Sequence, residues 1–259
     1  MADYILETED MTKEFRGFAA VSGVNLRVQR GSIHGLIGPN GAGKTTCFNL
    51  LTKFLQPTRG RIRYNGRDIT AMKPAEVARL GLVRSFQISA VFPHLTVLEN
   101  VRLALQRERG GSFDFWRRES VLTRYDARAM ELLAEVGLAN AAGLTAGSLS
   151  YGRKRALEIA TTLALEPEMM LLDEPTAGMT HEDVDRVTAL VKRVAAGRTV
   201  LMVEHNLKVV EGLCDRITVL TRGRILAEGP YAEVSRNPEV VAAYLGTDPT
   251  IAGGTAHAA

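Results

Sequence analysis

The chain has 259 residues, which is long enough for one large α/β domain or two small ones with a substantial buried core. Its 32 basic and 29 acidic residues leave a net charge of +3, which argues against a dedicated nucleic-acid surface. Two cysteines exclude a disulfide framework, and the acidic N-terminus lacks the features of a signal peptide, so we expect a reducing, cytosolic compartment. No apolar run of about 18 residues exists, so any membrane association must go through a partner.

The N-terminal part of the chain is typical of strands joined by turns. Apolar and polar positions alternate through much of 4–30, and a second apolar run follows at 33–37. Phe15 lies ahead of this run. Its ring could stack on an adenine or pack in the core, and the local sequence leaves both interpretations open.

The next stretch, Gly-Pro-Asn-Gly-Ala-Gly-Lys-Thr-Thr, fits the phosphate-loop pattern G-x-x-x-x-G-K-[ST] between a predicted strand and a helix-compatible segment at 47–55. Its glycines let the backbone N–H groups turn inward, and the helix start adds further donors and a positive dipole end. Lys44 would bring its charge to the β- and γ-phosphates, and Thr45 would bind Mg²⁺. A plain glycine-rich turn explains the glycines but not the Lys-Thr pair. The nucleotide-binding residues expected here are Gly38, Pro39, Asn40, Gly41, Ala42, Gly43, Lys44, Thr45 and Thr46.

Between the loop and the middle of the chain, the pattern predicts a hairpin at Asn65-Gly66, a short helix at 73–80 and a strand at 82–86 that ends at Gln87. The Gln87 amide could contact both Mg²⁺ and an attacking water. Taken alone, an ordinary polar strand end is the simpler interpretation.

The central block, 88–164, is predicted to be helical and inserted between strands. A capping box at 96–99 opens one helix, and an apolar stripe predicts another at 121–136. Between them, 107–118 is a charged excursion whose aromatic side chains could dock on a partner or pack locally. Near the end of the block, Ser150 and Gly152 open a helix whose N-terminus could bind an anion, although on these residues alone a simple helix cap is the favoured explanation.

After the central block, a continuous apolar run at 169–172 predicts a buried strand that ends in Asp173 and Glu174. Adjacent strand residues point to opposite faces, so the two acids would serve different functions. Asp173 suits coordination of Mg²⁺, either directly or through one of the ion's own ligands, and Glu174 is placed to orient and deprotonate a water against a γ-phosphate. A solvated acid pair is the alternative.

The rest of the chain continues the alternation of strands and helices. His205 follows the apolar strand 199–203. There it could donate a hydrogen bond to the γ-phosphate, or it could be an exposed surface residue without a functional role. The remaining predicted elements are a helix from Thr180 to about 195, a hairpin at 217–227, short helices at 231–236 and 239–245, and a disordered tail at 247–259.

Taken together and in this order, these segments resemble the nucleotide-binding subunit of an ABC transporter over roughly residues 4–246. The motifs that carry the resemblance are Walker A at 38–45, the Q-loop Gln87, the signature at 149–153, Walker B at 169–173 with Glu174, and the switch His205. The resemblance implies an α/β fold: a P-loop NTPase (RecA-like) core with an antiparallel β subdomain and an inserted α-helical subdomain. The implied boundaries are a single ABC ATPase domain at 1–246, with core and β subdomain at 1–87 and 165–230, helical subdomain at 88–164 and C-terminal helices at 231–246.

The resemblance also implies an ATPase with ATP and Mg²⁺ as cofactors. In that family the aromatic at the Phe15 position stacks the adenine, and ATP is sandwiched in a head-to-tail dimer against Ser150 and Gly152 of the other subunit. The implied catalytic residues are Glu174, His205, Gln87 and Lys44, and the implied metal-binding residues are Thr45, Gln87 and Asp173. Two departures affect this site: Tyr151 and Arg153 replace the usual signature residues, and the loop 177–180 lacks the usual aspartate.

Finer similarity points to the ATPases of branched-chain amino acid importers, and to the longer of their two ATPase subunits. It is carried by the sequence at 84–87, the excursion at 107–118, Tyr151 and the ending at 238–246. The implied partners are membrane permeases, a second ATPase subunit and, indirectly, a solute-binding protein, at the inner face of the plasma membrane. Relatives that import urea, amides or other amino acids share this tail.

Two other classes of nucleotide-binding protein fit this sequence less well. A soluble ABC ATPase of DNA repair or translation usually carries long coiled coils or two fused cassettes, and this chain has one cassette without a heptad insertion. A guanine nucleotide switch would need an Asn-Lys-x-Asp motif, which is not found.

Overall fold

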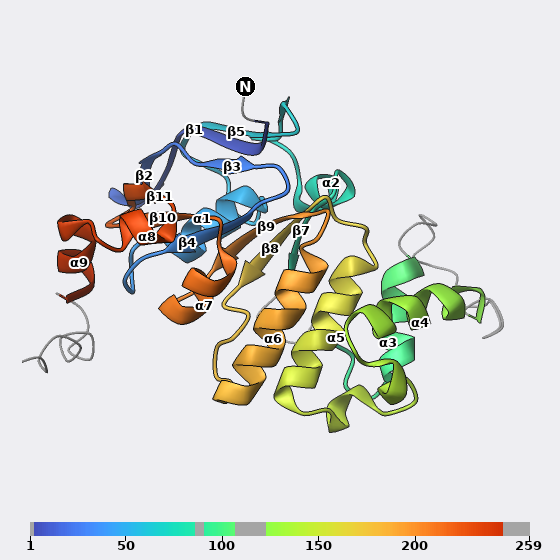
Figure 1. The fold of residues 1–259 in the computed structure, drawn as a ribbon. Coiled ribbons are helices and arrows are strands. Elements are labelled where there is room, and N and C mark those ends of the chain that lie inside the picture. The colour runs from blue at the N-terminus through green and yellow to red at the C-terminus, as the bar shows by residue number, and fades with distance from the viewer. Residues whose placement is uncertain (1–2, 86–90, 107–122, 246–259) are drawn as a thin grey trace, which may run out of the picture. The chain divides into compact units, whose positions relative to one another are not determined.

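A computed structural model describes residues 3–85, 91–106 and 123–245 of the chain (Figure 1). Gln87, the excursion at 107–118 and the predicted tail at 247–259 lie outside the described residues. Contacts divide the chain into a first unit, Met1–Leu80 with Thr199–Ala259, and a second unit, Gly81–Arg198. Within the described residues, no helix is both long enough and apolar enough to span a membrane.

The first unit contains an antiparallel sheet built on a long strand, β1 (Tyr4–Phe15). This strand pairs with β2 (Phe18–Val24), β3 (Arg27–Gln29) and β5 (Arg59–Tyr64), and β5 continues into β6 (Arg67–Asp68). The turn between β5 and β6 is the predicted Asn65-Gly66 hairpin, with both residues at positive φ as a type I′ turn requires.

The same unit contains a second sheet in the order β11-β10-β4-β9. The central strands β4 (Ile33–Ile37) and β9 (Thr199–Val203) are buried throughout and parallel, which explains their mostly apolar sequences. β10 (Arg216–Thr221) is parallel to β4, and β11 (Arg224–Gly229) returns beside it as a hairpin. The helices of this unit are α1 (Lys44–Leu51), α2 (Pro74–Arg79), α7 (Leu207–Leu213), α8 (Tyr231–Val234) and α9 (Pro238–Leu245).

Helix α1 is shorter than the sequence suggested. The segment 47–55 is helix-compatible, but the helix ends at Leu51 and Thr52 is its C-cap. Lys53 then takes a left-handed backbone with φ 65°. A left-handed residue stops the helical hydrogen-bond pattern, so the apolar residues after it belong to a turn.

The second unit pairs a short parallel sheet with a group of helices. β7 (Leu82–Ser85) lies parallel to β8 (Met169–Asp173). Figure 1 shows α3 (Val97–Leu105), α4 (Asp126–Glu135) and α5 (Tyr151–Leu163) packed on one another, with α6 (His181–Val194) beside α5. Short 3₁₀ turns at Thr123–Tyr125, Ala139–Ala141 and Ala146–Ser148 connect these helices.

Two helix starts of the second unit, those of α3 and α6, follow the predicted capping chemistry. The Thr96 Oγ1 accepts a hydrogen bond from the Glu99 backbone N–H at 3.2 Å, and the Glu99 carboxylate accepts one from the Thr96 N–H at 2.7 Å. This is the predicted capping box of α3. Thr180 caps α6 in the predicted way, through the backbone N–H of Asp183.

Candidate nucleotide-binding site

The phosphate loop joins the buried end of β4 to the start of α1, and its shape depends on glycine. Gly38, Gly41 and Gly43 have φ values of 150°, 78° and 103°, which other residues adopt only with strain. A Cβ on Gly38 would lie 2.2 Å from the carbonyl oxygen of Leu220, and a Cβ on Gly43 would lie 2.6 Å from that of Ala20. At Gly38 and Gly43 the loop therefore packs so closely against neighbouring backbone that no side chain fits.

Lys44 is the first residue of α1 and is only 8 % exposed. Its Nζ donates to the carbonyl oxygens of Gly38 at 2.6 Å and Pro39 at 3.0 Å, so the loop holds the ammonium group over itself. Thr45 is exposed and Thr46 half-buried, while Asn40 and Gly41 lie at the exposed tip. An ammonium group, inward-facing backbone and an exposed threonine at a helix N-terminus fit a polyphosphate with its Mg²⁺.

The predicted switch histidine follows a strand next to the one that carries the loop. Leu36 of β4 is opposite Val203 of β9, so the loop and His205 leave the same edge of the sheet. His205 is exposed. The buried carboxylate of Glu204 accepts the backbone N–H groups of His205 at 3.1 Å and Asn206 at 3.4 Å, which fixes the main chain at this position.

Phe15 ends β1 and is 43 % exposed, with the Lys13 Nζ 5.2 Å from its ring centroid. The sequence left two interpretations of this ring open, packing in the core and stacking on an adenine. A ring this exposed does not pack in the core. Stacking on an adenine stays a prediction, and an exposed aromatic face is what it requires.

The acidic pair belongs to the second unit. Asp173 is the last residue of β8 and is 2 % exposed, and its Oδ2 lies 2.5 Å from the Nη2 of Arg84 on β7. The argument that the two acids point to opposite faces assumed that Glu174 continues the strand. In the structure, β8 ends at Asp173 and Glu174 lies beyond it. It is half-buried and takes a left-handed backbone with φ 44°, so the turn after the strand, and not strand alternation, sets the direction of its side chain.

The signature segment opens α5 in the same unit. Ser150 is the N-cap residue, is exposed and has an extended backbone, but its hydroxyl makes no capping hydrogen bond. The simple-cap interpretation therefore does not account for the side chain. Gly152 is half-buried, and a Cβ there would lie 2.9 Å from the Oδ1 of Asp183. Tyr151 is exposed.

Sequence reasoning missed three charged residues around the acidic pair: the buried Arg155 and Glu158 and the half-buried Arg84. Arg84 pairs with the Asp173 carboxylate, and Arg155 on α5 pairs with Glu158 at 2.8 Å while also donating to the Asp173 backbone carbonyl. One sequence signal could have revealed these residues. Charged residues stand at the end of β7 and within α5, at positions that the strand and helix periodicities predict to be buried.

A glycine-dependent phosphate loop between a buried parallel strand and a helix, with a lysine and a threonine at its end, defines a P-loop nucleoside triphosphatase. The ABC transporter family profile matches residues 21–177, and a profile for branched-chain amino acid ATP-binding cassette transporters matches residues 224–250. The chain belongs to the ABC transporter ATP-binding family, and it is an ATPase that binds ATP.

Relatives of known name cover nearly the whole chain. The high-affinity branched-chain amino acid transport ATP-binding protein BraF of Pseudomonas aeruginosa is 40 % identical over 95 % of this chain and 99 % of its own length. The protein LivG of Escherichia coli, with the same descriptive name, is 36 % identical over 95 % of this chain and 99 % of its own length. A solved ATP-binding cassette of an ABC transporter in its ADP conformation superposes with a TM-score of 0.82 at 33 % identity, over 94 % of this chain and 99 % of that one. The predicted fold class is confirmed by these neighbours.

Proposed function

We propose that the chain is the ATP-hydrolysing subunit of an importer for branched-chain or related small amino acids. The observation that supports this proposal most directly is the match of residues 224–250 to the profile for branched-chain amino acid ATP-binding cassette transporters. It comes in addition to the match of residues 21–177 to the ABC transporter profile. Relatives named for branched-chain amino acid transport, at 36–40 % identity over nearly the full length, support the same substrate class.

The proposed chemistry follows from charge and position. Lys44 neutralises charge on the β- and γ-phosphates, and Thr45, Gln87 and Asp173 would hold Mg²⁺. A Mg²⁺ ion held there would supply positive charge that stabilises the charge developing on the phosphate. Glu174 takes a proton from the water that attacks the γ-phosphorus, as the bond from that phosphorus to the β,γ-bridging oxygen breaks and ADP leaves. His205 donates to the γ-phosphate, and Phe15 stacks the adenine.

A second ATPase subunit would complete the pocket with its own Ser150 and Gly152 equivalents. ATP would stabilise the closed dimer and hydrolysis would reopen it, so that differential binding to the two states does work on the permeases. This places the chain at the inner face of the membrane, with permeases as direct partners and a solute-binding protein as an indirect one. This proposal includes the expected subdomains. They are the RecA-like core with β subdomain at 1–87 and 165–230, the helical subdomain at 88–164 and the C-terminal helices up to residue 246.

The substitution Glu174→Gln tests the site. It keeps the size of the side chain but removes the base, so turnover should fall about 100-fold or more while ATP binding remains. Gel filtration with ATP should then show a trapped dimer. The exposed acid Glu168, replaced in Glu168→Gln, serves as a matched control that keeps wild-type turnover. Continued turnover by the Glu174→Gln protein, with only monomer in the presence of ATP, contradicts the assignment.

Extraction of membranes with a mild detergent tests the transport role. The tagged chain should copurify with membrane permeases, and uptake of a labelled branched-chain amino acid should depend on it. Recovery without permeases favours a non-transport ABC ATPase, and uptake of urea or amides in place of amino acids favours a related importer.

A further inference from the structure

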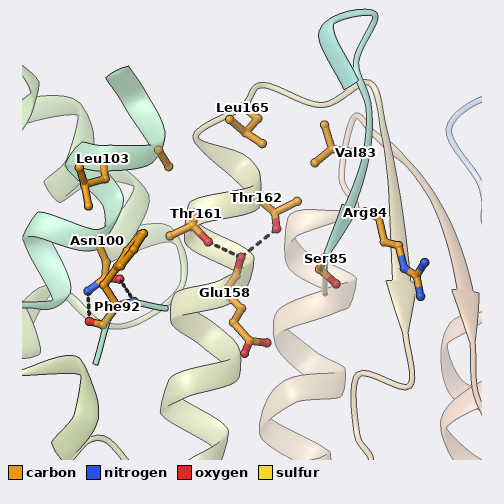
Figure 2. Close-up of a pocket in the computed structure, with 11 residues that line it drawn as sticks. Val83, Arg84, Ser85, Phe92, Asn100, Leu103, Glu158, Thr161, Thr162 and Leu165 are labelled. Atoms are coloured by element: carbon orange, nitrogen blue, oxygen red, sulfur yellow. Dashed lines mark hydrogen bonds between the residues drawn. The ribbon is translucent and has the colours of Figure 1, made fainter. Parts of the chain in front are cut away.

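A pocket of about 450 Å³ in the second unit has the charged side chains of Arg84 and Glu158 in its lining (Figure 2). Its wall is mostly apolar, and Ser85 and Glu158 contribute polar atoms. Figure 2 shows the hydroxyls of Thr161 and Thr162 both donating to the Glu158 carbonyl, at 2.9 and 2.8 Å. These hydrogen bonds lie within one turn of α5, and the Glu158 side chain of that turn lines the pocket.

Glu158 holds Arg155 one turn earlier on the same helix. The Arg155 Nη1 lies 2.8 Å from the Glu158 Oε2, and the two side chains are only 6 % and 11 % exposed. Burial raises the pKa of Glu158, and the hydrogen bond and charge of Arg155 oppose that rise. A pair this buried fixes the guanidinium plane, because neither charge can leave without being stranded in a low-dielectric site.

The other end of this guanidinium reaches the acidic pair. The Arg155 Nη2 donates to the Asp173 backbone carbonyl at 3.3 Å and lies 3.4 Å from the Ser85 Oγ. The Asp173 carbonyl belongs to the peptide group that joins Asp173 to Glu174. Glu174 leaves that peptide with φ 44°, an unfavourable conformation for a residue with a Cβ, which persists only where the surroundings hold it.

We propose that Arg155, held in place by Glu158, is a positioning residue for Glu174. It fixes the peptide group before Glu174, and so fixes the direction in which the Glu174 carboxylate leaves the strand end. In this role Arg155 acts through Glu174 and not on the nucleotide. The inference rests on the proposed role of Glu174 as the base that deprotonates water.

The substitution Arg155→Met tests this role by removing the donor while keeping most of the buried volume. We expect kcat for ATP hydrolysis to fall 10- to 100-fold, because small displacements of a catalytic group cost that much. KM for ATP and the dissociation constant for ATP should stay within twofold. Arg155→Lys keeps a charged donor and should recover part of kcat. If Arg155 contributed only to stability, Arg155→Met would lower the unfolding midpoint but would not lower kcat while leaving KM unchanged.

Two further variants keep the test decisive. Glu158→Gln removes the charge that holds Arg155 in place but keeps the arginine, so we expect a smaller fall in kcat than in Arg155→Met. If Arg155→Met does not fold, Glu158→Gln serves as the test. Arg128→Met removes an exposed ion pair of the same i, i+3 spacing on α4, with Glu131 at 3.0 Å, and should leave kcat within twofold. An unchanged kcat in folded Arg155→Met or, failing that, in Glu158→Gln overturns the inference. If Glu174→Gln itself hydrolyses ATP at the wild-type rate, the proposed function fails instead.

Discussion

Acid should destabilise this protein through one histidine in the strand that carries the phosphate loop. His34 is 0 % exposed in the middle of β4, and its Nε2 lies 2.8 Å from the Thr218 Oγ1. The Thr218 hydroxyl in turn donates to the Glu228 Oε2 at 3.3 Å, so it accepts the proton of the His34 Nε2–H. The Nδ1 has no hydrogen-bond partner within the described residues. The ring is therefore buried in its neutral form.

Burial, helped by the charge of Arg216, lowers the pKa of His34 from 6.5 to about 4. The unfolded chain binds a proton near pH 6.5, whereas the folded chain stays neutral until about pH 4. Because the folded pKa is the lower one, the stabilisation is complete above pH 6.5 and is lost as the pH falls towards 4. At about 1.4 kcal/mol per pKa unit, the loss approaches about 3 kcal/mol at pH 4.

Urea unfolding at a series of pH values from 7 to 4 measures this loss. His34→Gln keeps an amide donor for Thr218 and cannot titrate, so between pH 7 and 4 wild type should lose about 3 kcal/mol more than this variant. His181→Gln removes an exposed histidine at the start of α6 and should follow the wild-type curve. Parallel curves for wild type and His34→Gln would refute the reasoning.

Three further predictions follow from the described residues. Burial raises the pKa of the Cys47 and Cys214 thiols to about 12, so a thiol reagent at pH 8 should label neither in the folded protein and both in urea; rapid labelling of the native chain contradicts this. Gly38→Ala places a Cβ against the Leu220 carbonyl, so a folded variant should lose ATP binding at least tenfold, and equal affinity in equilibrium titration means that the loop tolerates a side chain. Thr180→Ala removes the N-cap of α6 and should cost about 1 kcal/mol in urea unfolding, with no change if the cap is dispensable.

The sequence could predict elements whose signal is local. The strands at Met169–Asp173 and Thr199–Val203 lie where continuous apolar runs placed them, because strands buried on both faces need apolar residues throughout. The capping box at Thr96 is confirmed for the same reason, since its hydrogen bonds join residues three apart.

Features set by tertiary contact could not be predicted. The end of α1 depends on the left-handed backbone at Lys53, and the apolar residues after it gave no sign of this. The link from Arg155 to the Asp173 carbonyl joins residues 18 apart in the chain, and only the packing of α5 against the strand end brings them together. The left-handed backbone of Glu174 was likewise invisible in a sequence that reads as a strand end.

The central claim is that Mg-ATP binds on the loop that ends in Lys44. Isothermal titration of the purified, folded chain with Mg²⁺ and a slowly hydrolysed ATP analogue tests it directly. We predict saturable binding of one nucleotide per chain and a loss of affinity of at least tenfold in Lys44→Ala, because that variant removes the charge facing the β- and γ-phosphates. Absence of binding by the wild-type chain, or equal affinity in Lys44→Ala, would contradict the claim.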